Sequence, residues 1–325
     1  MKGRPKGLGP QLAAGPDLRR DGLVIASFGR HVLVESPDGE RRLCHPRGKK
    51  NQAVVGDRVQ WLPSEDEGTI ERVTDRRNLF YRQDELRTKS FAANLDQVLI
   101  LIAAEPEFSE SQLTRALVAA EAERIKPLIA LNKRDLTVPF ERAWARLSNY
   151  RDMGYEVLAL AVKPNEAEGD PSHQALADLP ARLQGKTTLV LGPSGAGKSS
   201  LVNSLVPSAR VLTAEISQAL NSGKHTTTST TLYWLDESRQ SALIDSPGFQ
   251  EFGLHHIPPM QLAQLMPDVR AHAQACRFHN CTHLHEPGCG VITEAQVQGR
   301  PSRITANRWR LYRELFDELS QPPRY

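Results

Sequence analysis

The sequence predicts an α/β protein in which a parallel sheet carries the binding loops, with a small β-barrel before the sheet and a metal-binding region after it. Three observations support this architecture. Continuous apolar runs alternate with helical patterns between about residues 96 and 245, which is typical of a parallel sheet covered on both faces. Short strand-like runs separated by turn formers fill residues 22–80. Three of the four cysteines lie between Cys276 and Cys289.

The 325-residue chain has a net charge of only +3, but this charge is unevenly distributed. Residues 1–90 contain 18 lysines and arginines against 13 aspartates and glutamates, a surplus of five, so the remainder is about two negative. A basic end on a near-neutral body favours a polyanionic partner, with a solvated basic surface as an equal alternative. No apolar run reaches the eighteen residues that a membrane span needs, so we expect a cytoplasmic protein with no membrane partner.

The N-terminal part predicts a tail followed by a barrel. Residues 1–20 combine basic side chains with glycine and proline and lack the apolar core of a signal peptide, so we expect a disordered basic tail. Residues 21–82 contain strand-like runs at 23–26, 32–34, 59–61 and 69–73, and they fit an RNA-binding OB-fold, with a purely structural barrel as the alternative. The basic residues expected in a loop that leaves the barrel are Arg41, Arg42, Arg47, Lys49 and Lys50. Cys44 stands apart from the other cysteines and is expected to be a small buried side chain.

The sheet pattern occupies residues 83–252. Its predicted strands are 97–103, 128–131, 157–160, 188–191 and 242–244. Ser109 and Gln112 form a capping box that opens a helix after the first of these strands. Ligands of parallel sheets bind beyond the carboxyl ends of the strands, so the loops that follow the strands are the candidate binding site.

A phosphate-binding loop follows the strand at 188–191. The stretch from Gly192 to Ser199 fits G-x-x-x-x-G-K-[ST] and leads directly into a helix. Glycines let backbone N–H groups approach phosphate oxygens, and the helix directs its positive end at the same oxygens. Lys198 is expected to neutralise the β- and γ-phosphates, and the Ser199 hydroxyl to ligate Mg²⁺. The residues assigned to phosphate binding are Gly192, Pro193, Ser194, Gly195, Ala196, Gly197, Lys198, Ser199 and Ser200.

A guanine-reading motif follows the strand at 128–131. Asn132, Lys133, Arg134 and Asp135 fit N-K-x-D. The carboxylate of Asp135 can accept hydrogen bonds from both N1–H and N2–H of guanine, and adenine cannot match this pair. As in other GTPases, Asn132 is expected to hold the base edge and Lys133 to pack its stem over the ring. The serine of a second base-contact motif is absent near Ala161, so no residue is assigned there.

The order of these motifs is unusual. Asp245, Ser246, Pro247 and Gly248 fit D-x-x-G, and this motif comes last. An ordinary G domain has the phosphate loop first, then D-x-x-G, then N-K-x-D. Here the guanine reader precedes both phosphate motifs, so the chain resembles a circularly permuted P-loop GTPase.

Hydrolysis of GTP needs groups around the γ-phosphate. Asp245 is expected to hold Mg²⁺ through water, and the Gly248 N–H to sense the γ-phosphate. Phe249 stands where many GTPases have a water-orienting glutamine, so another group must position the water. Thr227 is the candidate for contact with Mg²⁺ and the γ-phosphate. His225 is the candidate for positioning water, and an ordinary surface histidine is weighed equally; with Lys198 these two complete the assigned catalytic set.

Residues 253–325 contain a predicted metal centre and a closing helix at 304–319. Cys276, Cys281, His283 and Cys289, at offsets 0, 5, 7 and 13, form a Cys₃His set suited to one closed, tetrahedral structural Zn²⁺. His279 and His285 are competing nitrogen donors, and three unrelated buried cysteines are the alternative.

Together the barrel, the three nucleotide motifs, the segment Gly223 to Thr227 and the cysteine cluster resemble the RsgA (YjeQ) family of ribosome-dependent GTPases. The resemblance favours His283 as the fourth zinc ligand. It implies binding of the 30S ribosomal subunit and 16S rRNA, a role in late small-subunit maturation, and GTP hydrolysis stimulated by the subunit. It also implies that the barrel and the zinc region grip the rRNA on either side of the G domain.

The short connection from Gly248 to the zinc region leads to a hypothesis that GTP holds the RNA-gripping geometry and that hydrolysis releases it. We expect a monomer. Two alternatives stay open at this point. One is an RNA clamp that uses GTP only as a structural ligand, and the other is an ATPase with an incidental N-K-x-D.

Overall fold

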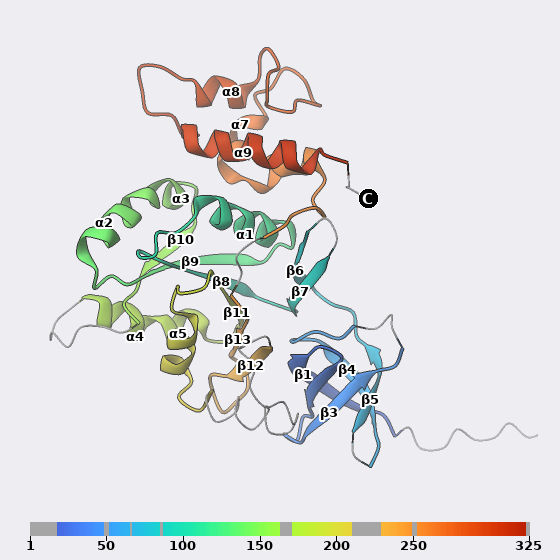
Figure 1. The fold of residues 1–325 in the computed structure, drawn as a ribbon. Helices are drawn as coiled ribbons and strands as arrows, with labels where there is room; N and C mark the ends of the chain where they lie inside the picture. The colour runs from blue at the N-terminus through green and yellow to red at the C-terminus, as the bar shows by residue number, and fades with distance from the viewer. Residues whose placement is uncertain are drawn as a thin grey trace, which may run out of the picture.

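The computed structural model describes residues 18–48, 52–65, 67–84, 87–162, 171–209, 229–248 and 252–322, with only the backbone for 171–175. A small barrel, a wide α/β sheet and a C-terminal helical region follow one another along the chain (Figure 1). No described helix is both long enough and apolar enough to cross a membrane. The domain boundaries after residues 20, 82 and 252 stay predictions.

Five strands form the N-terminal barrel. They run in the order β1-β2-β3-β5-β4, and β4 closes the barrel by pairing with β1. The fully buried Trp61 packs at the centre with Cys44, which agrees with the burial expected for that cysteine. The strands are β1 (Arg20–Phe28), β2 (His31–Glu35), β3 (Arg41–Pro46), β4 (Arg58–Pro63) and β5 (Gly68–Val73).

The placement of Arg41 and Arg42 in a loop was wrong. Both lie in β3, paired with Glu35 and Val34 of β2. Their charges obscured the strand in the sequence, but they lie on the barrel surface, where Arg41 binds the carboxylate of Glu35 at 2.8 Å. Arg47 lies in the turn after β3, whereas Lys49 and Lys50 lie outside the described residues.

The predicted parallel sheet is confirmed. Five parallel strands have the order β10-β9-β8-β11-β13, and all seven residues of β8 are buried because helices cover both faces. An antiparallel strand, β12 (Thr230–Trp234), was not predicted and follows β13 in the sheet. The parallel strands are β8 (Gln97–Ala103), β9 (Lys126–Asn132), β10 (Glu156–Ala159), β11 (Thr187–Leu191) and β13 (Ala242–Asp245).

The barrel and the α/β sheet are joined by hydrogen-bonded strands. β12 pairs antiparallel with β1, matching Thr231 with Ala26 and Thr230 with Ser27. The eleven strands therefore form one continuous sheet that runs from the G-domain core into the barrel. This pairing fixes the barrel against the last strand of the nucleotide-binding sheet.

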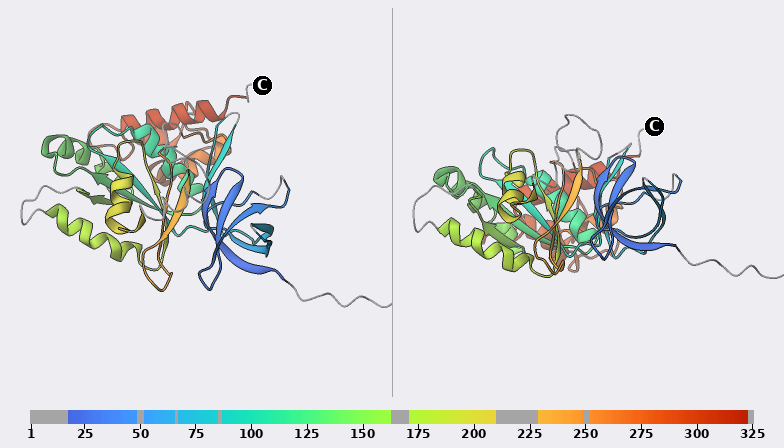
Figure 2. Two further views of the ribbon diagram at one scale, coloured as in Figure 1. Left: turned by 60° about the horizontal axis from the view of Figure 1, so that its bottom comes forward. Right: turned by 90° about the horizontal axis from the view of Figure 1, so that it is seen from below.

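Helices cover the two faces of the parallel sheet (Figures 1 and 2). The predicted capping residue of the first helix is confirmed, since Ser109 Oγ accepts a hydrogen bond from the Gln112 N–H at 3.3 Å. One face carries α1 (Glu110–Ala122), α2 (Thr137–Arg146) and α3 (Ser148–Asp152), and the other carries α4 (Pro171–Leu183) and α5 (Lys198–Leu205).

The C-terminal region packs on the helices above the sheet (Figure 1). Its elements are η1 (Pro259–Leu265), α7 (Pro267–Ala273), α8 (Gly290–Ala295) and α9 (Ala306–Leu319). Arg308 of α9 is 2 % exposed and binds Asp268 of α7 through two hydrogen bonds of 2.8 and 3.0 Å. It also donates to Thr114 of α1 at 2.8 Å, so one guanidinium connects the zinc region to the G domain.

A separate hairpin, β6 (Leu79–Gln83) and β7 (Thr88–Ala93), lies between the barrel and the C-terminal region (Figure 1). Its barrel end is bonded to the loop before β4, where the Ala93 N–H donates to Val55 O at 2.9 Å. Its other end pairs with the segment after the D-x-x-G motif through Gln83 and Leu254. The hairpin therefore contacts both the barrel and the chain that leaves the nucleotide site.

Candidate nucleotide site and metal centre

The phosphate loop connects the carboxyl end of β11 to α5, as expected. Gly197 has φ of 101° and a Cβ there would lie 2.4 Å from Asn132 Nδ2, so only glycine fits between the loop and the guanine motif. A Cβ at Gly192 would lie 2.1 Å from the carbonyl oxygen of Leu101 in β8. The loop is therefore pressed against the ends of two neighbouring strands. Pro193 to Ala196 form the turn, and Ser199 and Ser200 lie in the first turn of α5.

Lys198 lies under the loop and close to the D-x-x-G motif. It is 9 % exposed, and its Nζ donates to the carbonyl oxygens of Gly192 and Pro193 at 2.8 and 2.9 Å. A Cβ on Gly248 would lie 3.1 Å from the same Nζ. The ammonium thus stands where the loop meets the D-x-x-G glycine, and binding of a phosphate there would compete with its two carbonyl partners.

Asp245 ends β13 beside this lysine. Burial raises the pKa of Asp245 to about 6, and the Lys198 charge opposes this rise. Burial also lowers the pKa of Lys198, with Asp245 acting in the opposite direction. A partly buried carboxylate beside a buried ammonium, each shifting the pKa of the other, is typical of a functional site. A magnesium ion bound nearby would favour the ionised form of Asp245.

Asn132 connects the guanine motif to the phosphate loop. Its Nδ2 donates to Ala196 O at 2.9 Å, and its Oδ1 accepts from the Val162 N–H at 3.0 Å. The side chain is 4 % exposed. Because an amide nitrogen has two hydrogens, the second remains available for a base edge. Asn132 therefore holds three loops together, a role that the spacing of the motif did not reveal.

The rest of the guanine motif lies in the turn between β9 and α2. Lys133 has φ of 66°, and its ammonium donates to the carbonyl oxygen of Glu105. The Arg134 N–H donates to Leu160 O at 3.0 Å, which ties the motif to the end of β10. Asp135 lies in this turn and is partly exposed. The buried Ala161 and Val162 follow β10 beside it, where the second base contact was sought.

Three residues discussed for hydrolysis, His225, Thr227 and Phe249, lie outside the described residues. The assignments of His225 and Thr227 stay predictions. The described chain resumes at Phe252, three residues beyond Phe249. Phe252 is 2 % exposed and packs between Phe80 and Phe91 of the hairpin, with ring centroids 5.8 and 6.0 Å away.

The predicted metal ligands come together in the C-terminal region. One donor atom each from Cys276, Cys281, His283 and Cys289 lies within 4.8 Å of all the others. His283 Nδ1 is 3.4 Å from the sulfurs of Cys276 and Cys289, and those sulfurs are 3.7 Å apart. These separations fit a tetrahedral ion with metal–sulfur bonds of about 2.3 Å and metal–nitrogen bonds of about 2.0 Å. The competing donors His279 and His285 are exposed and outside the cluster.

The surrounding residues hold the ligand loop in place. Glu286 accepts hydrogen bonds from the Thr282 hydroxyl and N–H at 2.5 and 2.7 Å and from the Leu284 N–H at 3.2 Å. Burial raises the pKa of Glu286, but the bonds from the Thr282 hydroxyl and from backbone N–H groups outweigh it and lower the pKa. The Tyr312 hydroxyl of α9 donates to Thr282 O at 2.9 Å. The four donors include three thiols and leave no open position, so the set suits a structural ion better than a catalytic one.

Comparison with known proteins gives one consistent result. A family model described as RsgA GTPase matches residues 73–255. "Small ribosomal subunit biogenesis GTPase RsgA" from Variovorax paradoxus is 69 % identical over 314 residues, covering 96 % of this chain and 97 % of that protein. The protein of the same name from Paraburkholderia phymatum is 51 % identical over 327 residues, covering 99 % of each.

Two solved structures have the same fold over nearly the whole chain. YjeQ from Thermotoga maritima has a TM-score of 0.67 and 30 % identity, and the match covers 93 % of this chain and 99 % of that one. YloQ, described as a circularly permuted GTPase, has a TM-score of 0.66 and 26 % identity, and the match covers 97 % and 100 %. The inverted order of motifs in this chain therefore agrees with its similarity to a circularly permuted GTPase.

Proposed function

The chain belongs to the RsgA family of GTPases, and on that premise we propose that it binds the 30S ribosomal subunit through 16S rRNA and is released when GTP is hydrolysed. GTP hydrolysis is the activity of the family, which removes the ATPase and non-hydrolysing clamp alternatives. The relatives are named for small-subunit biogenesis, and this role extends to a chain that matches them end to end. We expect the protein to act as a cytoplasmic monomer late in subunit maturation.

The nucleotide would lie across the carboxyl ends of β9, β11 and β13. The N–H groups of the loop from Ser194 to Gly197 and the ammonium of Lys198 would surround the phosphates, and Asp135 would read guanine. Ser199 and Asp245 would hold Mg²⁺ directly and through water, and the ion would neutralise charge on the phosphates. The bond between Asn132 and Ala196 supports this arrangement, since it joins the base side and the phosphate side of the pocket.

The coupling between nucleotide and RNA rests on the chain that follows Gly248. Gln83 of β6 donates to Gly253 O at 3.1 Å and accepts from the His255 N–H at 3.0 Å. The Gly253 N–H also donates to Asp84 Oδ1 at 3.1 Å. A displacement of the D-x-x-G motif on loss of the γ-phosphate would therefore pull on the hairpin within about five residues of Gly248.

The displacement has two routes to surfaces that can touch RNA, one that starts at the hairpin and one that starts at Phe252. One runs through Ala93 and Asn94, whose Nδ2 donates to Gly56 O in the barrel at 2.9 Å. The other runs through Arg115 of α1, which donates to Phe252 O at 3.3 Å and binds Glu318 of α9. The same short segment thus contacts the connections to both outer regions. This is the observation that carries the proposal.

The outer regions have features expected of RNA-binding surfaces. The loop between the predicted ligands Cys276 and Cys281 exposes Arg277, Phe278, His279 and Asn280. The guanidinium of Arg277 lies 5.5 Å from the centroid of the Phe278 ring. Basic and aromatic groups on one loop suit contact with phosphates and unpaired bases. We propose that Zn²⁺ on the Cys₃His set holds this loop, and that the barrel binds a second stretch of rRNA.

The test compares 30S affinity in two nucleotide states for wild type and Gly253→Ala. A Cβ at residue 253 would lie 2.3 Å from Asp84 Oδ1 and 2.5 Å from Gln83 O, so the substitution separates the hairpin from the segment. We expect wild type to bind at least about tenfold more tightly with a non-hydrolysable GTP analogue than with GDP, and the variant to lose this difference.

A matched control is Gly154→Ala, in the turn before β10. A Cβ there meets no atom within 4 Å, so only its φ of 92° adds strain. This control should keep the nucleotide dependence of 30S binding. Equal affinity of wild-type protein for the subunit with GDP and with the analogue would show that hydrolysis does not control release.

A further inference from the structure

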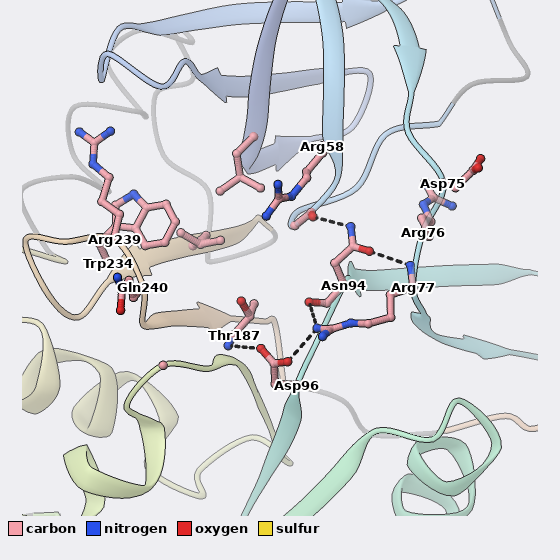
Figure 3. Close-up of a pocket in the computed structure, with 14 residues that line it drawn as sticks. Arg58, Asp75, Arg76, Arg77, Asn94, Asp96, Thr187, Trp234, Arg239 and Gln240 are labelled. Carbon is pink, nitrogen blue, oxygen red and sulfur yellow. Dashed lines mark hydrogen bonds and ion pairs between the residues drawn. The ribbon is translucent and has the colours of Figure 1, made fainter.

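A second pocket lies between the barrel and the α/β sheet, at the opposite end of the sheet from the phosphate loop (Figure 3). Its floor includes Asp96, the residue before β8, and Thr187, the first residue of β11, whereas the phosphate loop follows the end of β11. The cavity volume is about 760 Å³, which is within the range of small-molecule sites. The nucleotide chemistry described above does not use it.

Four arginines line this pocket, but two are already committed. Arg76 binds Asp57 through two hydrogen bonds of 2.8 Å. Arg77 binds Asp96 at 2.8 Å and the carbonyl oxygen of Asn94 at 2.9 Å. These two pairs hold the linker between barrel and sheet. They form a rigid wall of the pocket and offer little charge to a ligand.

The other two arginines are less committed. Arg58 is exposed on β4, and its side chain has no hydrogen bond or ion pair with any described residue. Its guanidinium points from the barrel into the space above Asp96 (Figure 3). Arg239 is 3.4 Å from Glu35, but that carboxylate also binds Arg41 at 2.8 Å, so one negative charge serves two cations.

The carboxylates of the pocket do not cancel these charges. Asp96 accepts from Arg77 and from the Thr187 N–H at 2.8 Å, so its charge is paired with Arg77 and each oxygen already accepts one hydrogen bond. Asp75 is exposed and points away from the centre of the pocket (Figure 3). The centre therefore presents an uncompensated guanidinium to an incoming anion.

Part of the pocket lining is apolar. Trp234 of β12 donates from Nε1 to Glu35 Oε1 at 2.8 Å, which fixes the plane of its indole. Leu23 and Leu232 line the pocket next to it. An aromatic ring and an available guanidinium that line the same pocket suit a ligand that has both a planar ring and a phosphate, because bases stack on such rings.

We propose that this pocket binds a nucleoside phosphate, with its phosphate on Arg58 and its base against Trp234. Two sources share this chemistry, namely a free nucleotide and one nucleotide unit of an RNA strand. The site is separate from the GTP site and does not depend on the ribosomal role proposed above. A ligand there would bridge β4 of the barrel and β12 of the sheet.

The experiment is calorimetry on the full-length protein saturated with GDP, so that the first site is filled. The probes are adenosine 3′,5′-bisphosphate, which the guanine-reading site rejects, and a twelve-residue oligoadenylate. Arg58→Ala should weaken binding by about tenfold or more, because a charged hydrogen bond is lost, and Arg58→Lys should weaken it less. Basal GTP hydrolysis should not change in either variant, because Arg58 is far from the phosphate loop. The matched control is Arg72→Ala, an exposed arginine of β5 outside the pocket.

Each outcome decides the proposal. Arg58-dependent binding of the bisphosphate supports a free nucleotide as the ligand, and Arg58-dependent binding of the oligomer alone supports an RNA strand. Trp234→Leu should weaken either kind of binding as well. If neither probe binds, or if Arg72→Ala weakens binding as much as Arg58→Ala, the pocket is not a site and the barrel only attracts anions diffusely.

Discussion

Asn132 and Ala196 lie 64 positions apart in the chain and are joined by a hydrogen bond of 2.9 Å from the side-chain amide to the backbone carbonyl. This bond places the first residue of the guanine motif against the phosphate loop. The inversion of motif order along the sequence therefore does not separate the two halves of the site. Permutation changes the connections between strands but leaves the strand ends where a nucleotide needs them.

Asn132→Ala should weaken GDP and GTP binding by about tenfold and lower the free energy of unfolding by about 1–3 kcal/mol. The physical reason is that the buried Val162 N–H and the Ala196 carbonyl lose their partner. Nucleotide titration and urea unfolding measure the two effects. Asn149→Ala in α3 is the control, and a variant at position 132 that binds nucleotide like this control would contradict the role given to the amide.

Arg308→Ala should destabilise the protein by about 3–5 kcal/mol, because it leaves the carboxylate of Asp268 buried without its partner. The pair is almost fully buried, with exposed side-chain fractions of 3 % and 2 %. Arg310→Ala on the same helix breaks an exposed pair with Glu314 and should cost less than about 1 kcal/mol. Denaturant unfolding measures the free energy of unfolding of both variants. Equal losses would mean that the buried pair stabilises the protein no more than the exposed pair does.

Acid should weaken the contact between the hairpin and the segment after Gly253. His256 packs against Tyr81 with ring centroids 4.3 Å apart and the rings tilted by 37°, and its Nδ1 is buried with no partner among the described residues. Burial, aided by His255, lowers the pKa of His256 to about 4 from 6.5. The unfolded chain then binds more protons between these values, so stability is complete above pH 6.5 and falls as the pH drops toward 4.

His256→Gln should remove part of this pH dependence. The side chain is partly exposed, so the expected difference from wild type between pH 7 and pH 4.5 is only about 1 kcal/mol. Thermal unfolding across this pH range measures it. Identical pH profiles for wild type and variant would show that His256 stays solvated in the folded protein.

Removal of the metal should unfold the C-terminal region selectively. We expect one zinc per chain in the wild type and none in Cys289→Ser, with a fall of several degrees in Tm. Cys44→Ser is the control, since Cys44 is buried in the barrel away from the cluster and should keep the zinc. Metal analysis that finds one zinc in both variants would exclude Cys289 as a ligand.

The sequence predicted the elements whose own residues determine them. β8 is a continuous apolar run with every residue buried, and Ser109 caps its helix through a local hydrogen bond. The spacing of the cysteines and His283 likewise predicted four metal donors, and the structure places their donor atoms within 4.8 Å of one another. Each of these signals is contained in a short stretch of chain.

The missed features depend on contacts between distant residues. β12 lies between β13 and β1, and its partners in β1, Ser27 and Ala26, are about two hundred residues away in the sequence. The hairpin strand from Leu79 to Gln83 mixes polar and apolar residues, and its place in the fold comes from pairing with β7 and with Leu254. Periodicity and spacing contain no information about such pairs.

The central claim is that Asp135 and Lys198 act on one guanine nucleotide, and the most direct test is the base selectivity of Asp135→Asn. Replacing the carboxylate with an amide removes one of two acceptors for guanine N1–H and N2–H. GTP hydrolysis by the variant, measured as kcat/KM, should fall at least about tenfold, while ATP stays as poor a substrate as for wild type. Undiminished preference for GTP over ATP in this variant would contradict the account.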